Sequence, residues 1–204
     1  LISMSCEAVG GKTKDTIPFS EALVFITAAA DLHDDLIDTS ALKGKKQTVL
    51  GKFGSTTAIL VGDILLVEGI NRLCEAGDKI SKEQSNKIIH LVSNAVFEIC
   101  RAETIESKLR SKPNISPQEY QETIELKSIV PEVTMKIGGI LGKGNQREVK
   151  MLGEYGKSYG IVSIAVEEFA DLLELGELQN RLKNECPPLP LICALQDTRL
   201  RKSL

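Results

Sequence analysis

Residues 22–38 read ALVFITAAADLHDDLID, and this stretch decides both the fold class and the chemistry that the chain can support. Residues 22–30 are apolar apart from Thr27, and the acidic segment follows without a glycine or proline, so we expect one helix to run through both parts. On that helix Asp34 and Asp38 are i,i+4 neighbours, with β-carbons roughly 6 Å apart. Carboxylates this close repel each other, and the negative end of the helix dipole adds to the repulsion. A hard divalent cation with oxygen ligands, such as Mg²⁺, would offset both effects.

A solvated acidic helix end is the alternative interpretation of this cluster, although a long apolar helix before it argues against that. A second acidic cluster, Glu167, Glu168 and Asp171, also follows an apolar helical run, residues 161–166, and has the same i,i+4 spacing. Two such clusters facing each other across a helical bundle would hold a set of Mg²⁺ ions around a diphosphate. Metal ions can neutralise a diphosphate leaving group without proton transfer.

The rest of the sequence predicts an all-α fold. Apolar residues recur at three- and four-residue spacing in the remaining long segments, and no stretch alternates with period two over strand length, so sheets are not expected. Glycine and proline breaks fall at residues 10–11, 44, 51–54, 112–117, 142–144 and 187–190. We therefore expect residues 1–204 to form a single domain of about eight helices.

Composition narrows the class of protein further. The chain has 204 residues and a net charge of −3, which argues against binding nucleic acid through a broad basic face. Five scattered cysteines suit a reducing cytoplasm better than a disulfide scaffold. The longest apolar run is less than half of a membrane span, so we expect a cytoplasmic protein with no transmembrane segment.

Six motifs, in the same order along the chain, resemble those of the trans-isoprenyl diphosphate synthases, also called polyprenyl synthetases. They include the first aspartate-rich block, a diphosphate-gripping loop, a G-D-x-L-L helix, a K-T pair, the second aspartate-rich block and a T-L-P-L-I segment. In this chain they occupy residues 33–38, 44–54, 61–66, 127–128, 159–171 and 188–192. The resemblance places the family's earlier G-K-R segment upstream of residue 1, so the N-terminal part of the family domain is expected to be absent.

The resemblance implies an all-α bundle with a central cavity for the growing prenyl chain, usually as a homodimer or in a heteromer. The substrates would be an allylic prenyl diphosphate and isopentenyl diphosphate, and the cofactor Mg²⁺. The implied catalytic residues are Asp34, Asp38 and Lys127. The implied substrate-binding residues are Lys43, Lys52, Lys127 and Ser128. The implied metal ligands are Asp34, Asp35, Asp38, Glu167 and Asp171.

The sequence departs from the family pattern at several of these places. Lys43 stands roughly where the family has an arginine pair, and Leu50 replaces a histidine that helps to bind isopentenyl diphosphate. Ile164 replaces a glutamine ahead of the second block, in which Glu167 and Glu168 replace two aspartates. These departures affect the isopentenyl site more than the first metal cluster.

The sequence is therefore compatible with four functions. The first is a complete synthase, and the second is a non-catalytic or partly active subunit of a heteromeric synthase. A class I terpene cyclase ranks below both, because Leu175 stands where its second metal motif has a glutamate. A metal-independent helical interaction protein would leave the paired acidic clusters unexplained.

The alanines at residues 28–30 bear on product length. Small residues one turn before the first acidic cluster imply a deep cavity and a product of geranylgeranyl length or longer. Alanine is also simply a good helix former, and Phe25 or Ile26 could still close the pocket.

Overall fold

The computed structural model describes residues 1–112 and 114–197, and most of these residues are helical, which confirms the all-α prediction. The α-helices are Ile2–Ala8 (α1), Ile17–Ile37 (α2), Val49–Phe53 (α3), Ser55–Gly77 (α4), Lys82–Leu109 (α5), Pro117–Lys127 (α6), Ile129–Leu141 (α7), Gln146–Leu173 (α8), Leu175–Asn184 (α9) and Leu189–Gln196 (α10). A 3₁₀ helix spans Thr13–Thr16 (η1), and two short antiparallel strands span Leu42–Lys43 (β1) and Lys46–Gln47 (β2).

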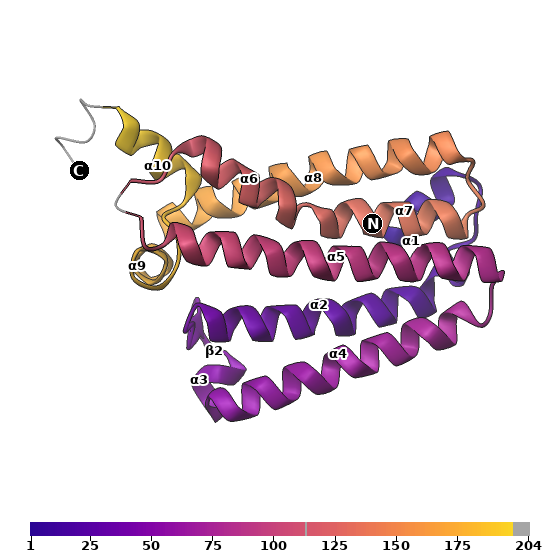
Figure 1. The fold of residues 1–204 in the computed structure, drawn as a ribbon, viewed down its shortest axis with the longest axis horizontal. Coiled ribbons are helices and arrows are strands. Elements are labelled where there is room, and N and C mark those ends of the chain that lie inside the picture. The colour runs from indigo at the N-terminus through magenta and orange to yellow at the C-terminus, as the bar shows by residue number, and fades with distance from the viewer. Residues whose placement is uncertain (113, 198–204) are drawn as a thin grey trace.

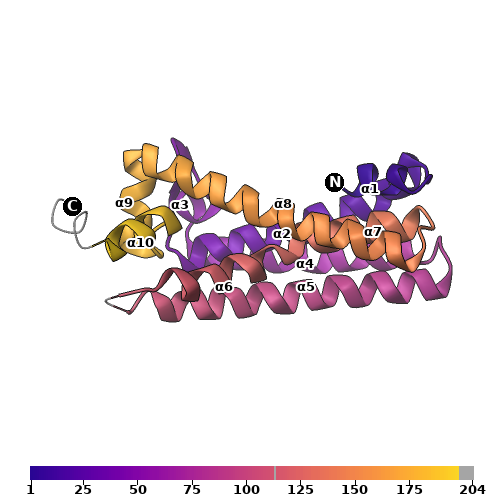
Figure 2. The same cartoon turned by 90° about the horizontal axis from the view of Figure 1, so that it is seen from above.

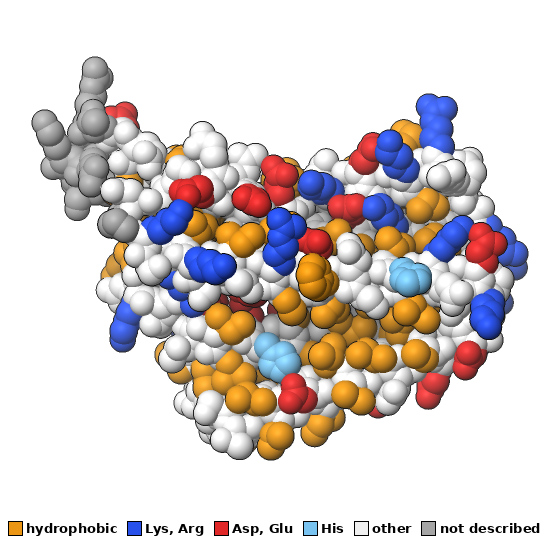
Figure 3. Space-filling view, viewed as in Figure 1, with side chains coloured by type: hydrophobic (Ala, Val, Ile, Leu, Met, Phe, Trp, Pro, Cys, Tyr) orange, Lys and Arg blue, Asp and Glu red, His pale blue; other side chains and the backbone are white. Residues whose placement is uncertain are grey.

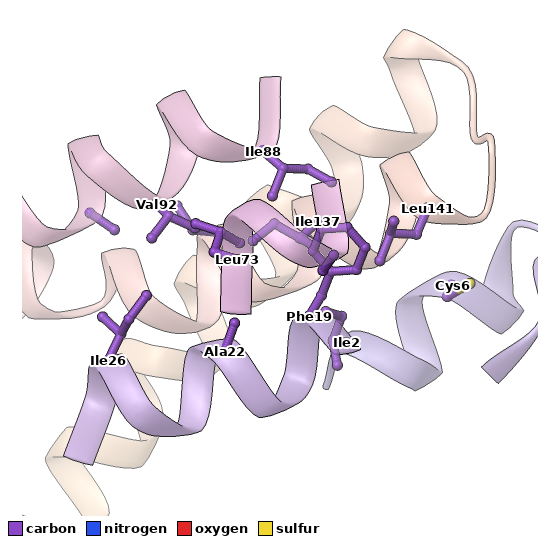
Figure 4. Close-up of a cluster of buried hydrophobic side chains, with 13 residues drawn as sticks. Ile2, Cys6, Phe19, Ala22, Ile26, Leu73, Ile88, Val92, Ile137 and Leu141 are labelled. Carbon is purple, nitrogen blue, oxygen red and sulfur yellow. The ribbon is translucent and has the colours of Figure 1, made fainter. Parts of the chain in front are cut away.

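The long helices lie roughly along one direction and enclose a core at their centre. Helix α2 packs along α4, α7 packs against α8, and α5 runs beside α6 and α7 (Figures 1 and 2). The largest buried cluster joins α1, α2, α4, α5 and α7, with Phe19, Ile88 and Ile137 almost fully buried (Figure 4). The shorter helices α9 and α10 lie at the same end of the bundle as the C-terminal ends of α2 and α5 (Figures 1 and 2).

Glycines allow two pairs of helices to approach closely. A Cβ at Gly69 of α4 would lie 2.6 Å from Ile26 Cγ1 of α2. A Cβ at Gly138 of α7 would lie 2.2 Å from the carbonyl oxygen of Ile2 in α1. Both distances are well inside van der Waals contact, so these helix pairs keep their spacing only because the glycines lack a side chain.

Serine side chains cap two of the helices, and three expectations from the sequence are corrected by the structure. Ser81 and Ser116 cap α5 and α6 with their side chains, and Ser116 forms a full capping box with Glu119. The expected break at residues 51–54 is confined to Gly54, since Gly51 lies inside α3. The expected absence of strands is corrected by the β1–β2 hairpin, which is too short to show a period-two pattern. Helices α6 and α7 are separated only by Ser128, so the described residues contain more helices than expected.

No helix within residues 1–112 and 114–197 is both long enough and apolar enough to cross a membrane.

The buried core predicts where the fold is most sensitive. Ile137→Ala should lower the free energy of unfolding by about 3 kcal/mol, because it removes buried methylenes and leaves a cavity. Val162→Ala on the exposed side of α8 is the matched control and should change it by less than about 0.5 kcal/mol. Urea denaturation measures both, and equal effects of the two substitutions would contradict this placement of the core.

Candidate active site

The first acidic cluster lies at the C-terminal end of α2. Asp34 and Asp35 belong to its last turn, and Asp38 is the C-cap, whose backbone N–H donates to the Asp34 carbonyl at 2.9 Å. Asp35 and Asp38 are buried. The sequence prediction of one helix running from the apolar segment into the acids is therefore confirmed.

Two of these aspartates have basic partners brought from distant segments. Lys43 Nζ, on the hairpin strand β1, lies 2.8 Å from Asp35 Oδ1. Arg110, the C-cap of α5, forms an ion pair with Asp38 and donates to the Ile37 carbonyl at 3.2 Å. The charges of Lys43 and Arg110 thus offset Asp35 and Asp38 in place of bulk water.

Asp34 differs from Asp35 and Asp38 because it forms no ion pair among the described residues, and its buried Oδ1 atom has no hydrogen-bond partner there. Its charge acts on the rest of the cluster. Burial and, after it, the nearby Asp34 carboxylate raise the pKa of Asp38 to about 7, although Arg110 acts in the opposite direction. Burial and the Asp34 charge also act to raise the pKa of Glu185, which lies between α9 and α10. A buried, unpaired carboxylate oxygen among other acids demands a cation.

An apolar cavity of about 550 Å³ opens beside Asp34. Its walls are side chains of α2, α4, α5 and α7, and Ala29 and Ala30 form part of the α2 wall. Asp34 and Glu103 are among its few acidic lining residues. Figure 3 shows hydrophobic side chains gathered around a hollow on the face where α2 and α5 run in Figure 1. The geometry combines an apolar pocket with an acidic wall.

Lys127, at the last turn of α6, lies between two glutamates of α5. Its Nζ atom is 2.8 Å from Glu103 Oε1 and 2.6 Å from Glu106 Oε2. Burial alone would lower the pKa of Lys127, but the two carboxylates raise it above its ordinary value, so the ammonium group stays charged. The structure therefore holds a fixed positive charge near the acidic wall of the cavity.

The other predicted substrate-binding residues lie apart from this centre. Ser128 is fully buried between α6 and α7, and its hydroxyl donates to the Glu125 carbonyl at 2.6 Å. Lys52 is exposed on α3, with its Nζ atom 5.1 Å from the ring centroid of Phe53. Their proposed roles with substrate stay predictions.

The second acidic cluster is arranged differently from the first. Glu167 is exposed, whereas Glu168 is buried and accepts a hydrogen bond from Tyr120 Oη at 2.6 Å. Arg181, on α9, donates to Glu168 at 3.1 Å and to Asp171 at 2.8 Å. Metal ligation by Glu167 and Asp171 stays a prediction.

Sequence reasoning did not find Arg110, Tyr120 or Arg181. Tyr120 carries only the weak signal of an aromatic residue one turn after the capping box of α6. Arg181 stands four residues before Glu185, which suggests a local ion pair but gives no sign of the long-range contacts to α6 and α8. These partners depend on how the helices pack.

The donor set of the first cluster fits magnesium. Among the described residues no three His, Cys, Asp or Glu side chains converge as a ready-made metal site. Mg²⁺ does not require such a cage, since it usually keeps several waters and binds through one or two carboxylates plus substrate phosphates. Asp34, which lines the cavity and has a buried Oδ1 atom without a hydrogen-bond partner, would supply that kind of contact.

Comparison with known proteins identifies the class of this helical bundle. The sequence profile of the family described as Polyprenyl synthetase matches residues 1–177. The match covers most of the chain and includes both acidic clusters. The chain belongs to the polyprenyl synthetase family.

Individual relatives agree with this assignment. The chain is 26% identical over 175 residues to a short chain isoprenyl diphosphate synthase of Methanothermobacter thermautotrophicus, covering 85% of this chain and 53% of that protein. It is 26% identical over 198 residues to an octaprenyl diphosphate synthase of Escherichia coli, covering 94% of this chain and 59% of the relative. The structure of a geranylgeranyl pyrophosphate synthetase from Pyrococcus horikoshii aligns with a TM-score of 0.78 and 29% identity, over 85% of this chain and 52% of that one. The chain thus spans little more than half the length of these proteins.

The charge environment of Glu103 predicts a pH-dependent stability. Burial raises the pKa of Glu103 from 4.5 to about 7, although Lys127 acts in the opposite direction. Between these two pH values the folded state holds more protons than the unfolded state, so the free energy of unfolding falls as pH rises through this window. In EDTA, the free energy of unfolding should fall between pH 5 and pH 8 by about 2 kcal/mol less in Glu103→Gln than in the unaltered chain.

Urea denaturation at the two pH values measures this difference. Glu75→Gln, at an exposed position of α4, is the control and should leave the pH dependence as it is. If both variants kept the full dependence, the environment described for Glu103 would be wrong.

Proposed function

We propose that residues 1–204 form a single-domain prenyltransferase that condenses isopentenyl diphosphate with an allylic prenyl diphosphate, with Mg²⁺ as cofactor. The observation that carries the proposal is the apolar cavity with Asp34 and Glu103 on its wall and Lys127 bound to Glu103, in a chain of the polyprenyl synthetase family. An apolar pocket suits a hydrocarbon tail, and the charged wall suits a diphosphate.

In the proposed reaction the bond between the allylic carbon and its diphosphate breaks, and the double bond of isopentenyl diphosphate attacks that carbon. A proton then leaves, with the released diphosphate as its acceptor. When bound, Mg²⁺ would supply the charge neutralisation that this departure requires. Asp34, Asp35 and Asp38 would hold the metal, and Lys127 would grip the diphosphate. The apolar walls would keep water away from the reacting carbon.

The alternative is a subunit that acts only together with a partner. The departures at Leu50 and Ile164, and the glutamates that replace aspartates in the second acidic block, motivate this possibility. Helix α4 exposes a row of apolar side chains that would suit a second copy or another synthase subunit: Ile59, Leu60, Ile64, Val67 and Ile70. Light scattering on the purified chain would give its oligomeric state.

Turnover by the isolated chain decides between the two functions. With Mg²⁺, labelled isopentenyl diphosphate and an allylic diphosphate, we expect elongated products that disappear with EDTA. Asp34→Asn should lower the rate by about 100-fold or more, because it removes a charged metal ligand. Asp78→Asn, at the C-cap of α4, is the control and should retain activity. A folded, Mg²⁺-binding chain without product would favour the heteromer subunit.

Product length should depend on the α2 wall of the cavity. We propose a product of geranylgeranyl length or longer, because Ala29 and Ala30 leave the pocket open at this level. Ala30→Phe would fill that space and should shift the products to shorter chains, measured by chromatography of the dephosphorylated alcohols. Val24→Phe, on the exposed side of the same helix, should leave the products unchanged. An unchanged length in Ala30→Phe would place the end of the prenyl chain elsewhere.

A further inference from the structure

We propose that Arg181 takes the place of a divalent cation at the second acidic cluster, so that metal ions bind to this chain at the first cluster alone. The family resemblance predicts the opposite, with Glu167 and Asp171 as ligands. The inference goes beyond the proposed function, because it concerns which cation, Arg181 or a metal ion, offsets the negative charge of the second acidic cluster.

The first observation is that the guanidinium group of Arg181 is already bound on every side. Nη1 donates to Asp171 at 2.8 Å, and Nη2 donates both to Tyr120 Oη at 2.8 Å and to Glu168 at 3.1 Å. Nε donates to the Cys186 carbonyl at 3.4 Å and lies 3.6 Å from Glu185 Oε2. The side chain is 10% exposed. A buried arginine with this many partners is a fixed part of the fold.

The second observation is that both oxygens of the buried Glu168 carboxylate already accept hydrogen bonds. Its Oε1 atom accepts from Tyr120 and Arg181, and its Oε2 atom accepts from the backbone N–H of Leu189 at 2.9 Å. Four elements, α6, α8, α9 and α10, therefore meet on one carboxylate. A metal ion could use Glu168 only if several of these bonds broke together.

The two acidic clusters thus differ in whether their buried carboxylate oxygens have partners. At the first cluster Asp34 keeps a buried oxygen without a hydrogen-bond partner in the described part of the chain. At the second cluster Glu168 and Asp171 share one guanidinium, and Glu167 alone is exposed. A cation that entered the second cluster would place its charge beside Arg181, which like-charge repulsion opposes.

Counting bound metal tests the proposal directly. Mn²⁺ is titrated into the 204-residue chain with inorganic pyrophosphate present, and free Mn²⁺ is followed by electron paramagnetic resonance. Asp171→Asn should bind as many Mn²⁺ ions as the unaltered chain, with the same affinity. Asp34→Asn should weaken binding by about tenfold or more, because it removes a direct ligand. Asp171→Asn leaves Arg181 its bonds to Glu168 and Tyr120, so the fold should persist.

One Mn²⁺ ion fewer in Asp171→Asn, with an unchanged melting temperature in EDTA, would overturn the proposal. This result is distinguishable from failure of the proposed function. If the unaltered chain bound no Mn²⁺ at all, metal binding at the first cluster would be overturned together with the proposed function, whereas one ion fewer in Asp171→Asn overturns only the role of Arg181.

A second experiment removes the charge of Arg181 and tests whether Mn²⁺ can take its place. Without metal, Arg181→Gln should melt at a lower temperature than the unaltered chain, because Glu168 and Asp171 lose their counter-charge. Mn²⁺ should then raise the melting temperature of Arg181→Gln by more than that of the unaltered chain, since bound ligand stabilises the folded state. Arg181→Lys keeps a positive charge and should show the smaller shift.

If Arg181→Gln folds only with Mn²⁺, the yield of refolded protein replaces the melting temperature as the readout. Equal effects of Mn²⁺ on the unaltered chain and Arg181→Gln would overturn the proposal.

Discussion

Crowding of carboxylates at one end of the helical bundle is the constraint on which the rest of the structure depends. Each buried acid there needs a positive partner, and the partners come from different elements: Lys43 from β1, Arg110 from the end of α5, Lys127 from α6 and Arg181 from α9. The ion pairs therefore join segments from the whole length of the chain. Removing one partner of a buried pair typically costs about 3–5 kcal/mol, so the same charges that serve the site also fix the helices around it.

The apolar cavity and the acidic wall influence each other. Hydrophobic side chains of α2, α4, α5 and α7 line most of the cavity, and electrostatic interactions are stronger where the effective dielectric constant is low. The unpaired oxygen of Asp34 is costly in this setting, whereas the hydrogen-bonded oxygens of Glu168 are not. The two halves of the site thus use similar residue types, but only the first has an aspartate without an ion-pair partner among the described residues.

The sequence predicts those features that depend on neighbouring residues. The helical periodicity and the i,i+4 placement of Asp34 and Asp38 are both local, and the structure agrees with each. The position of Lys127 at the site followed from the family resemblance. Nothing local distinguishes Arg181 from Lys183, which lies two residues further along the same helix. Only the packing of α9 against α8 decides that Arg181 reaches the acids.

Helix α9 is in contact with both the hairpin and the second acidic cluster. Asn180 donates to Ser40 Oγ at 3.2 Å and Glu177 accepts from the backbone N–H of Gly44, while Arg181 reaches Glu168. Successive residues of an α-helix are rotated by about 100°, so one residue inserted between Glu177 and Arg181 would turn one set of contacts away from its partners. During evolution this segment is therefore expected to accept changes of side chain more readily than changes of length.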